Sequence, residues 1–175
     1  MPDGNGFQRA MPEYDQLPGI ERGQVVTAED VMARNSRPGH RVLLLDETAN
    51  WKGAGTALTL AEAGHQVTLV TPAPSVMAEM ARTAADIQLR ARLRALGVRL
   101  VTETVVREWH GDGATIEVAG GKPEHVVADT LVIAATNISN RELADELGVP
   151  AIGDAVAARN AAMAIYEGRK LAMNL

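Results

Sequence analysis

The chain has 175 residues, of which 46% are hydrophobic and only 3% aromatic, and its formal net charge at pH 7 is −5. This length fits one domain, or one domain with part of a second, and the acidic balance argues against a nucleic-acid partner. The lack of cysteine excludes disulfides, thiol nucleophiles and cysteine-bound iron–sulfur clusters within the chain, and no apolar run approaches the ~20 residues that span a bilayer.

The N-terminal part predicts an arm followed by the first regular elements. Residues 1–23 are rich in glycine, proline and charge, and they show no signal-peptide pattern, so we expect a cytoplasmic protein with no membrane partner. A short strand is predicted over Gln24–Val26. Thr27 then has the character of a helix N-cap, with acidic residues in the first helical turn. The continuous apolar run Arg41–Asp46 indicates a strand that is covered on both faces.

The middle of the chain continues the alternation of helices and strands. A helix of small residues is predicted over Gly53–Ala63, a strand over Gln66–Thr71, a long helix over Ser75–Leu96 and a strand over Val98–Val101. Strands that alternate with helices in this way pair in parallel through right-handed crossovers.

The pattern changes after residue 101. Short strands at Thr104–Trp109, Ala114–Val118 and His125–Val127 are separated by glycine-rich turns, which predicts an antiparallel three-strand excursion. A buried strand at Thr130–Ala135 then returns to the parallel sheet. Two helices are expected after it, over Asn140–Leu147 and from about Ala157 to Met173. The predicted fold class is therefore α/β, with a Rossmann-like parallel sheet and an antiparallel excursion.

The turn after the strand Arg41–Asp46 departs from the usual nucleotide-binding pattern. Asp46 and Glu47 stand where a G-x-G-x-x-G loop would bring backbone N–H groups to a pyrophosphate. The residues that could hold a phosphate here are Asn50, Trp51, Lys52, Gly53 and Gly55, with the lysine offsetting the two acids.

The alternative reading of this turn, which the acids favour, is structural. Trp51 packs against a partner and the glycines allow close approach of helix and strand. At the end of the second strand, Val70–Pro72 provides neither the acid that binds a ribose 2′-OH nor the arginine that binds a 2′-phosphate. NAD(P) therefore stays open as a ligand of this domain, with the turn arguing against it.

Other reactive residues give no pattern of catalysis or metal binding. Arg90, Arg92 and Arg94 are most simply a solvated helix face. The four histidines have no metal-ligand spacing, and no Ser/His/Asp set suggests a triad. We expect neither a catalytic residue nor a metal site.

The order of these elements, with Val149–Asp154 (VPAIGD) and the helix that follows, resembles two-dinucleotide flavoproteins. More narrowly, residues 19–175 are similar to the C-terminal FAD/NAD(P)-binding region of the trimethylamine dehydrogenase / 2,4-dienoyl-CoA reductase (NADH:flavin oxidoreductase) family. The segments that carry this resemblance are Gly19–Met32, the non-glycine turn Leu45–Gly55, Gly64–Pro72 and Ala151–Gly168.

The resemblance implies a division into three parts. Residues 1–39 would form an arm and part of an incomplete FAD/ADP-type lobe, residues 40–135 an NAD(P)-binding-like Rossmann domain, and residues 136–175 the C-terminal part of the lobe. In the family, a β-α-β unit with a glycine loop, an FMN-carrying barrel and a cysteine cluster for iron–sulfur precede this region. We therefore expect a larger flavin-containing catalytic subunit that holds FMN and the iron–sulfur cluster and completes the lobe.

The resemblance also points to Gly153 and Asp154. The family's equivalent acid lies at a helix N-terminus and bonds the sugar or ribityl chain of a dinucleotide, which implies FAD or ADP shared with the partner chain. The alternative is a simple turn with Asp154 as N-cap.

Three functions are compatible with these features. The chain is the small, non-catalytic subunit of a heteromeric flavin-dependent oxidoreductase of the amine dehydrogenase or enoate reductase kind. Alternatively, it is a structural interaction module whose nucleotide sites have decayed, or a free-standing NAD(P)H-binding domain.

Overall fold

The computed structural model describes residues 17–137 and 139–174, and these form two compact units. We call residues 17–135 the sheet unit and residues 136–174 the C-terminal unit, and each is described by itself. Every helix in the described ranges is too short or too polar to cross a membrane.

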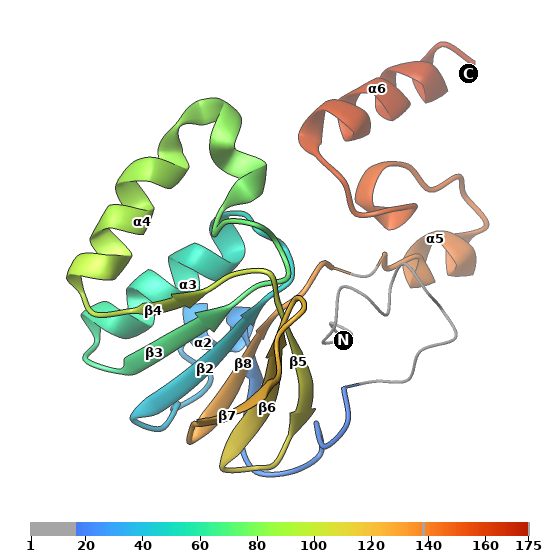
Figure 1. The fold of residues 1–175 in the computed structure, drawn as a ribbon. Helices are drawn as coiled ribbons and strands as arrows, with labels where there is room; N and C mark the ends of the chain where they lie inside the picture. Colours follow the sequence, from blue (N-terminus) through green and yellow to red (C-terminus); the bar gives the residue numbers. More distant parts are fainter. Residues whose placement is uncertain (1–16, 138, 175) are drawn as a thin grey trace. The chain divides into compact units, whose positions relative to one another are not determined.

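Five parallel strands form the central sheet of the sheet unit (Figure 1). In spatial order they are β1 (Val25–Thr27), β8 (Thr130–Ala134), β2 (Arg41–Asp46), β3 (Gln66–Val70) and β4 (Arg99–Val101). The central strands β2 and β8 are buried along almost their whole length, as their continuous apolar sequences predict. The predicted parallel sheet is confirmed.

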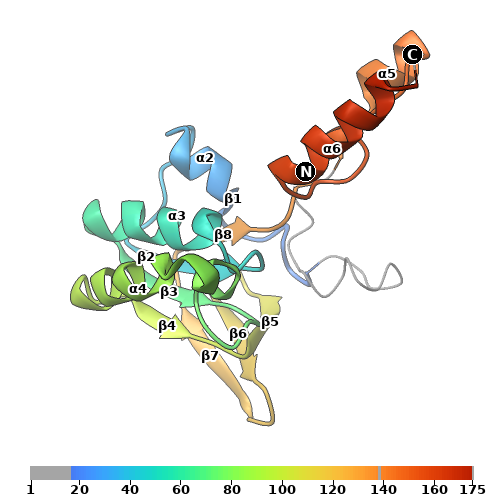
Figure 2. The same ribbon diagram turned by 90° about the horizontal axis from the view of Figure 1, so that it is seen from above.

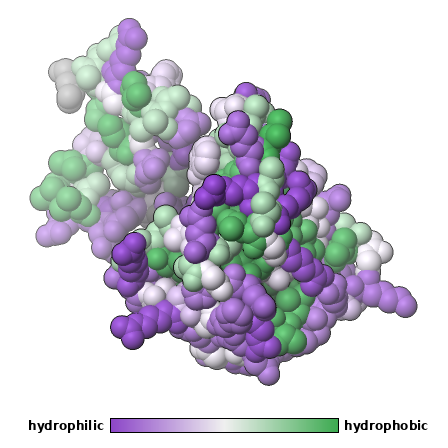
Figure 3. All heavy atoms as spheres, turned by 90° about the vertical axis from the view of Figure 1, so that its left-hand side faces the viewer, coloured by the Kyte–Doolittle hydropathy of each residue, from purple (hydrophilic) through white to green (hydrophobic). Residues whose placement is uncertain are grey.

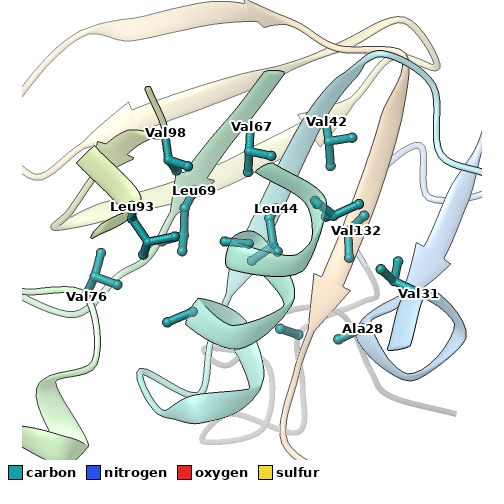
Figure 4. Close-up of a cluster of buried hydrophobic side chains, with 14 of the residues drawn as sticks. Ala28, Val31, Val42, Leu44, Val67, Leu69, Val76, Leu93, Val98 and Val132 are labelled. Atoms are coloured by element: carbon teal, nitrogen blue, oxygen red, sulfur yellow. The ribbon is translucent and has the colours of Figure 1, made fainter. Parts of the chain in front are cut away.

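Helices cover one face of this sheet (Figure 2). They are α2 (Ala28–Met32), α3 (Trp51–Glu62) and α4 (Ala85–Ala95), and a 3-10 helix, η1 (Ala78–Thr83), precedes α4. Alternate strand residues such as Val42 and Leu44 point to this side and pack with Ala54 and Leu93 of the helices (Figure 4). Hydrophilic residues predominate on the near face of the sheet unit in Figure 3.

An antiparallel sheet covers the opposite face. Its strands are β5 (Thr104–Trp109), β6 (Gly113–Val118) and β7 (Pro123–Val127), in that order. The other set of strand residues, including Leu43 and Leu45, packs against it around the buried Trp109. The indole Nε1 of Trp109 donates a 2.7 Å hydrogen bond to the carbonyl oxygen of Arg22. The predicted three-strand excursion is thus confirmed as the third layer of the unit.

The prediction of one long helix over Ser75–Leu96 is wrong. Met77 and Ala84 adopt left-handed backbone conformations (φ 62° and 55°), so the chain forms η1, breaks at Ala84 and only then begins α4. Nothing in η1 is buried, and Ile87 in the first turn of α4 is 61% exposed. The turn at Met77 instead buries Val76 and Met77 in the core, and the N–H of Glu79 donates to the carbonyl oxygen of Ala49.

The C-terminal unit consists of α5 (Glu142–Leu147), a 3-10 turn η2 (Gly153–Ala155) and α6 (Ala161–Ala172). The last helix begins four residues later than expected because Asn160 is its N-cap, accepting a 3.0 Å hydrogen bond from the N–H of Met163. Neither α5 nor α6 contains a buried residue.

The expected division at residues 39 and 135 stays a prediction. The structure adds that β1 and α2, which that division assigns to the second lobe, belong to the sheet unit. Val25–Thr27 of β1 pair with Leu131–Ile133 of β8. Ala28 and Val31 of α2 are buried in the core of the sheet unit.

Candidate functional site

The turn between β2 and α3 lies at the carboxyl end of the central strand, where this class of sheet binds its ligands. Asn50 is the N-cap of α3, and its side-chain oxygen accepts a 2.8 Å hydrogen bond from the N–H of Lys52. This cap starts the helix at Trp51, two residues before the expected start. Trp51 itself is 56% exposed.

Asp46, the last residue of β2, is completely buried and organises the turn. Its Oδ1 atom accepts hydrogen bonds from the N–H of Thr48 (3.1 Å), the hydroxyl of Thr48 (2.8 Å) and the N–H of Ala49 (3.0 Å). Its Oδ2 atom is buried without a hydrogen-bond partner in the described chain. Burial raises the pKa of the Asp46 carboxyl, although the hydrogen bonds from Thr48 and Ala49 act in the opposite direction.

Gly53 packs directly on this carboxyl group. A Cβ atom at Gly53 would lie 2.1 Å from Cγ of Asp46, whereas one at Gly55 would meet nothing within 4 Å. The close helix–strand approach considered for the glycines therefore holds at Gly53 and not at Gly55.

The side chain of Lys52 is held by two residues outside the turn. Its Nζ donates a 2.6 Å hydrogen bond to the carbonyl oxygen of Ala135, just after β8, and forms an ion pair with Glu29 of α2. Glu29 lies 23 residues before Lys52 in the sequence, so no local spacing links the two. The phosphate-binding role of Asn50, Trp51, Lys52, Gly53 and Gly55 stays a prediction.

Gly153 and Asp154 lie in the C-terminal unit, in the turn η2. Gly153 has a positive φ of 62°, and its N–H donates a 2.7 Å hydrogen bond to Oε2 of Glu167 on α6. Glu167 also forms an ion pair with Arg159. The hydrogen bond from Arg159, and to a smaller extent that from Gly153, lowers the pKa of the Glu167 carboxyl. We call the contact between Gly153 and Glu167 the clamp, and no local sequence pattern indicates it because its members are 14 residues apart.

Asp154 is exposed on this turn. Its Oδ1 atom accepts a 3.3 Å hydrogen bond from the N–H of Arg159, but the N-cap of α6 is Asn160. The alternative that made Asp154 an N-cap therefore does not apply to α6. Its carboxylate retains acceptor positions for a ligand, and the ligand role stays a prediction.

The three arginines of α4 differ from one another. Arg92 pairs with Glu62 at the surface, whereas Arg90 lies partly buried, 2.7 Å from a buried carboxylate oxygen of Asp86. Only part of the arginine set is thus a solvated face. Across residues 17–137 and 139–174, no group of three or more acidic or histidine side chains is placed to hold a metal ion.

Comparisons with known proteins agree with this architecture. The family model for pyridine nucleotide-disulphide oxidoreductases matches residues 51–165. No curated protein matches the sequence.

Solved structures match over most or all of the chain. Histamine dehydrogenase from Rhizobium sp. 4-9 is 26% identical with a TM-score of 0.87, and the match covers 100% of this chain and 29% of that one. The 6-hydroxypseudooxynicotine amine oxidase HisD from Pseudomonas geniculata N1 is 26% identical with a TM-score of 0.84, covering 92% of this chain and 26% of that one. A 2-naphthoyl-CoA reductase shares the fold at 24% identity and a TM-score of 0.76, covering 93% of this chain and 25% of that one.

The chain thus spans less than a third of the length of each of these proteins. The match over the whole chain supports the fold resemblance expected from the sequence. The chain belongs to the pyridine nucleotide-disulphide oxidoreductase family, and its fold is that of the FAD/NAD(P)-binding domain of a flavin-dependent oxidoreductase.

Proposed function

We propose that this chain is the small, non-catalytic subunit of a heteromeric flavin-dependent oxidoreductase that acts on amines or enoates. It completes a dinucleotide-binding lobe together with a larger, flavin-containing subunit. The observation that carries this proposal is the incomplete core of the C-terminal unit, in which neither α5 nor α6 has a buried residue.

The apolar side chains of this unit are exposed instead. The large hydrophobic residues exposed in it are Leu143, Leu147, Val149, Ile152, Val156, Ile165, Tyr166 and Met173. Amphipathic elements gain stability by burying such side chains against another layer, so the exposed set indicates a missing layer.

The segment before η2 supports the same conclusion. Ile152 has an extended backbone (φ −138°, ψ 167°), and the N–H groups of Ala151 and Ile152 make no hydrogen bond within the described chain. We expect a neighbouring strand from the partner to pair with these N–H groups. In this proposal the partner supplies the first part of the lobe, and it also holds FMN and the iron–sulfur cluster.

The residues of this chain bind and orient the nucleotide, which is FAD or ADP. The clamp between Gly153 and Glu167 fixes the turn, and the Asp154 carboxylate at its surface accepts a hydrogen bond from a ribose or ribityl hydroxyl. The flavin, when bound, supplies the hydride and electron transfer, and no group of this chain takes part in bond making.

Native purification followed by analysis of released nucleotides tests the proposal. The full chain is expected to co-purify with a larger flavoprotein subunit, and Asp154→Ala to lower FAD or ADP content several-fold while association and FMN content stay unchanged. The control is Asp145→Ala, which removes an exposed carboxylate from α5 of the same unit. Failure to associate contradicts the subunit role, and unchanged nucleotide content in Asp154→Ala contradicts the role of Asp154.

A structural interaction module is the second candidate. It is favoured by the turn after β2, where Lys52 is already engaged by Glu29 and Ala135 while Trp51 is exposed. Exposed tryptophan is a common anchor of protein interfaces. A complex that contains no nucleotide at all but dissociates on Trp51→Ala would favour this candidate. Tight NAD(P)H binding by the isolated chain would instead favour a free-standing reductase domain.

A further inference from the structure

The turn between β2 and α3 already contains an anion acceptor. In doubly wound folds, the N–H groups that follow the first strand and begin the next helix hold the pyrophosphate of a dinucleotide. Here the N–H groups of Thr48 and Ala49 both donate to Oδ1 of Asp46, at 3.1 and 3.0 Å, and the Thr48 hydroxyl donates to the same atom at 2.8 Å. The donors nearest to the end of β2 are therefore used within the chain.

The Asp46 carboxyl also fills the space between the strand end and the helix. The position of a Cβ at Gly53 is 2.1, 2.3 and 2.5 Å from Cγ, Oδ1 and Oδ2 of Asp46. Since Asp46 has no exposed surface, a phosphate group would have to displace the carboxyl group to reach these N–H groups.

Lys52, the cation of this turn, is not available to attract a phosphate. Lys52 is held by the ion pair with Glu29 and by the carbonyl of Ala135. At the end of β3, the hydroxyl of the buried Thr71 accepts a hydrogen bond from the N–H of Ala73 at 3.3 Å. The position that normally recognises the ribose of NAD(P) is thus also engaged within the chain.

We infer that the Asp46 carboxyl group is an internal substitute for a ligand phosphate, so that the sheet unit keeps the geometry of a dinucleotide-binding turn without binding NAD(P) there. The residues present do not fit the pyrophosphate of the cofactor that the fold suggests. This inference is independent of the proposed function, which assigns the nucleotide to the C-terminal unit and a partner.

The test replaces the internal anion by an external one. Asp46→Gly, made in the full chain, leaves the N–H groups of Thr48 and Ala49 without an acceptor and opens space beside Gly53. At constant ionic strength, a tenfold excess of inorganic pyrophosphate over its dissociation constant should raise the Tm of this variant by about 3–6 °C. Wild type should not respond. Asp46→Asn, which retains a side-chain oxygen, should not respond either.

Asp112→Gly is the matched control, because it removes the same charge from a hairpin turn elsewhere in the sheet unit. A response of Asp46→Gly no larger than that of Asp112→Gly overturns the inference. The amide NMR signals of Thr48 and Ala49 in wild type give a second measurement that does not depend on the folding of any variant. These signals should stay unchanged when NADH or pyrophosphate is added, and a saturable shift in them would overturn the inference as well.

Discussion

The sheet unit and the C-terminal unit bury their apolar residues to very different extents. In the sheet unit, the two faces of one parallel sheet are covered by helices and by a second sheet, and Leu43 and Leu44 are fully buried on opposite sides. In the C-terminal unit, neither α5 nor α6 contains a fully buried residue. Regular helices and their caps therefore form from local interactions, whereas a core requires a layer packed on each apolar face.

Hydrogen exchange of the full chain gives the largest expected contrast. The backbone amides of β2 should exchange at least about 1000-fold more slowly than those of α6, which corresponds to about 4 kcal/mol in opening free energy. Mass spectrometry of peptides from each unit measures this ratio, and binding of the partner should reduce it by protecting α6. Equal protection in the chain alone would show that the C-terminal unit has a sufficient core of its own.

Two substitutions by alanine, one in each unit, test the same difference in side-chain burial. Leu44→Ala should lower the free energy of unfolding by about 2–5 kcal/mol, because it leaves a cavity in a closed core. Ile165→Ala, at a side chain that is 72% exposed, should change it by less than about 0.5 kcal/mol. Urea unfolding of the isolated chain measures both variants. A loss at Ile165 as large as that at Leu44 would contradict the comparison.

Two glycines of α3 show how tightly the sheet unit is packed at the candidate site. Gly53→Ala should destabilise the chain by about 1–3 kcal/mol, because the added Cβ collides with the buried Asp46 carboxyl. Gly55→Ala is the matched control, since its Cβ meets nothing, and it should stabilise the chain by about 0.5–1 kcal/mol through helix propensity. Thermal unfolding of the two variants should therefore shift in opposite directions.

The smallest expected effect is a change in how folding stability depends on pH in acid. The hydrogen bonds from Arg41 lower the pKa of Asp129 from 3.8 to about 2. A carboxyl with a lowered pKa stabilises the folded state above its unfolded pKa, and this stabilisation is lost as the pH falls from about 4 to about 2. Asp129→Asn should therefore reduce stability at neutral pH and flatten its decline over this range.

The C-terminal unit offers the corresponding control. The pKa of Glu167 is also lowered, chiefly by Arg159, but its unit lacks a closed core. Glu167→Gln should therefore leave the acid dependence of global unfolding unchanged, as followed by fluorescence of the buried Trp109. A change as large as that of Asp129→Asn would mean that the two units unfold together.

Local rules predicted much of the fold. Thr27 was expected to cap a helix, and it forms a capping box with Asp30, in which each side chain bonds the backbone of the other. The glycine-rich turns predicted the meander, and Gly111 and Gly120 adopt the positive φ values that such turns use. Both signals depend on neighbours within a few residues, which a single sequence displays.

The candidate site was only partly predictable, because several of its contacts join residues that are far apart in the sequence. The acids of the turn were recognised as unfavourable for an external anion, but the packing of Gly53 of α3 on the buried Asp46 carboxyl depends on how helix and strand meet. Lys52 was expected to offset these acids, whereas in the structure it pairs with Glu29 and donates to the carbonyl oxygen of Ala135. These two partners of Lys52 are distant in the sequence and are brought to it by the packing of α2 against α3 and the pairing of β8 with β2.

The alternation of strands and helices, the antiparallel excursion and the departure from a glycine loop can all be predicted from the amino-acid sequence, because periodicity, turn chemistry and residue type are local properties. Three features depend on tertiary packing: the break before α4, the contact of Gly53 rather than Gly55 with the end of β2, and the pairing of Lys52 with Glu29. Each of these depends on packing and charge pairing between segments far apart in the chain, where the free energy of burial outweighs local propensity.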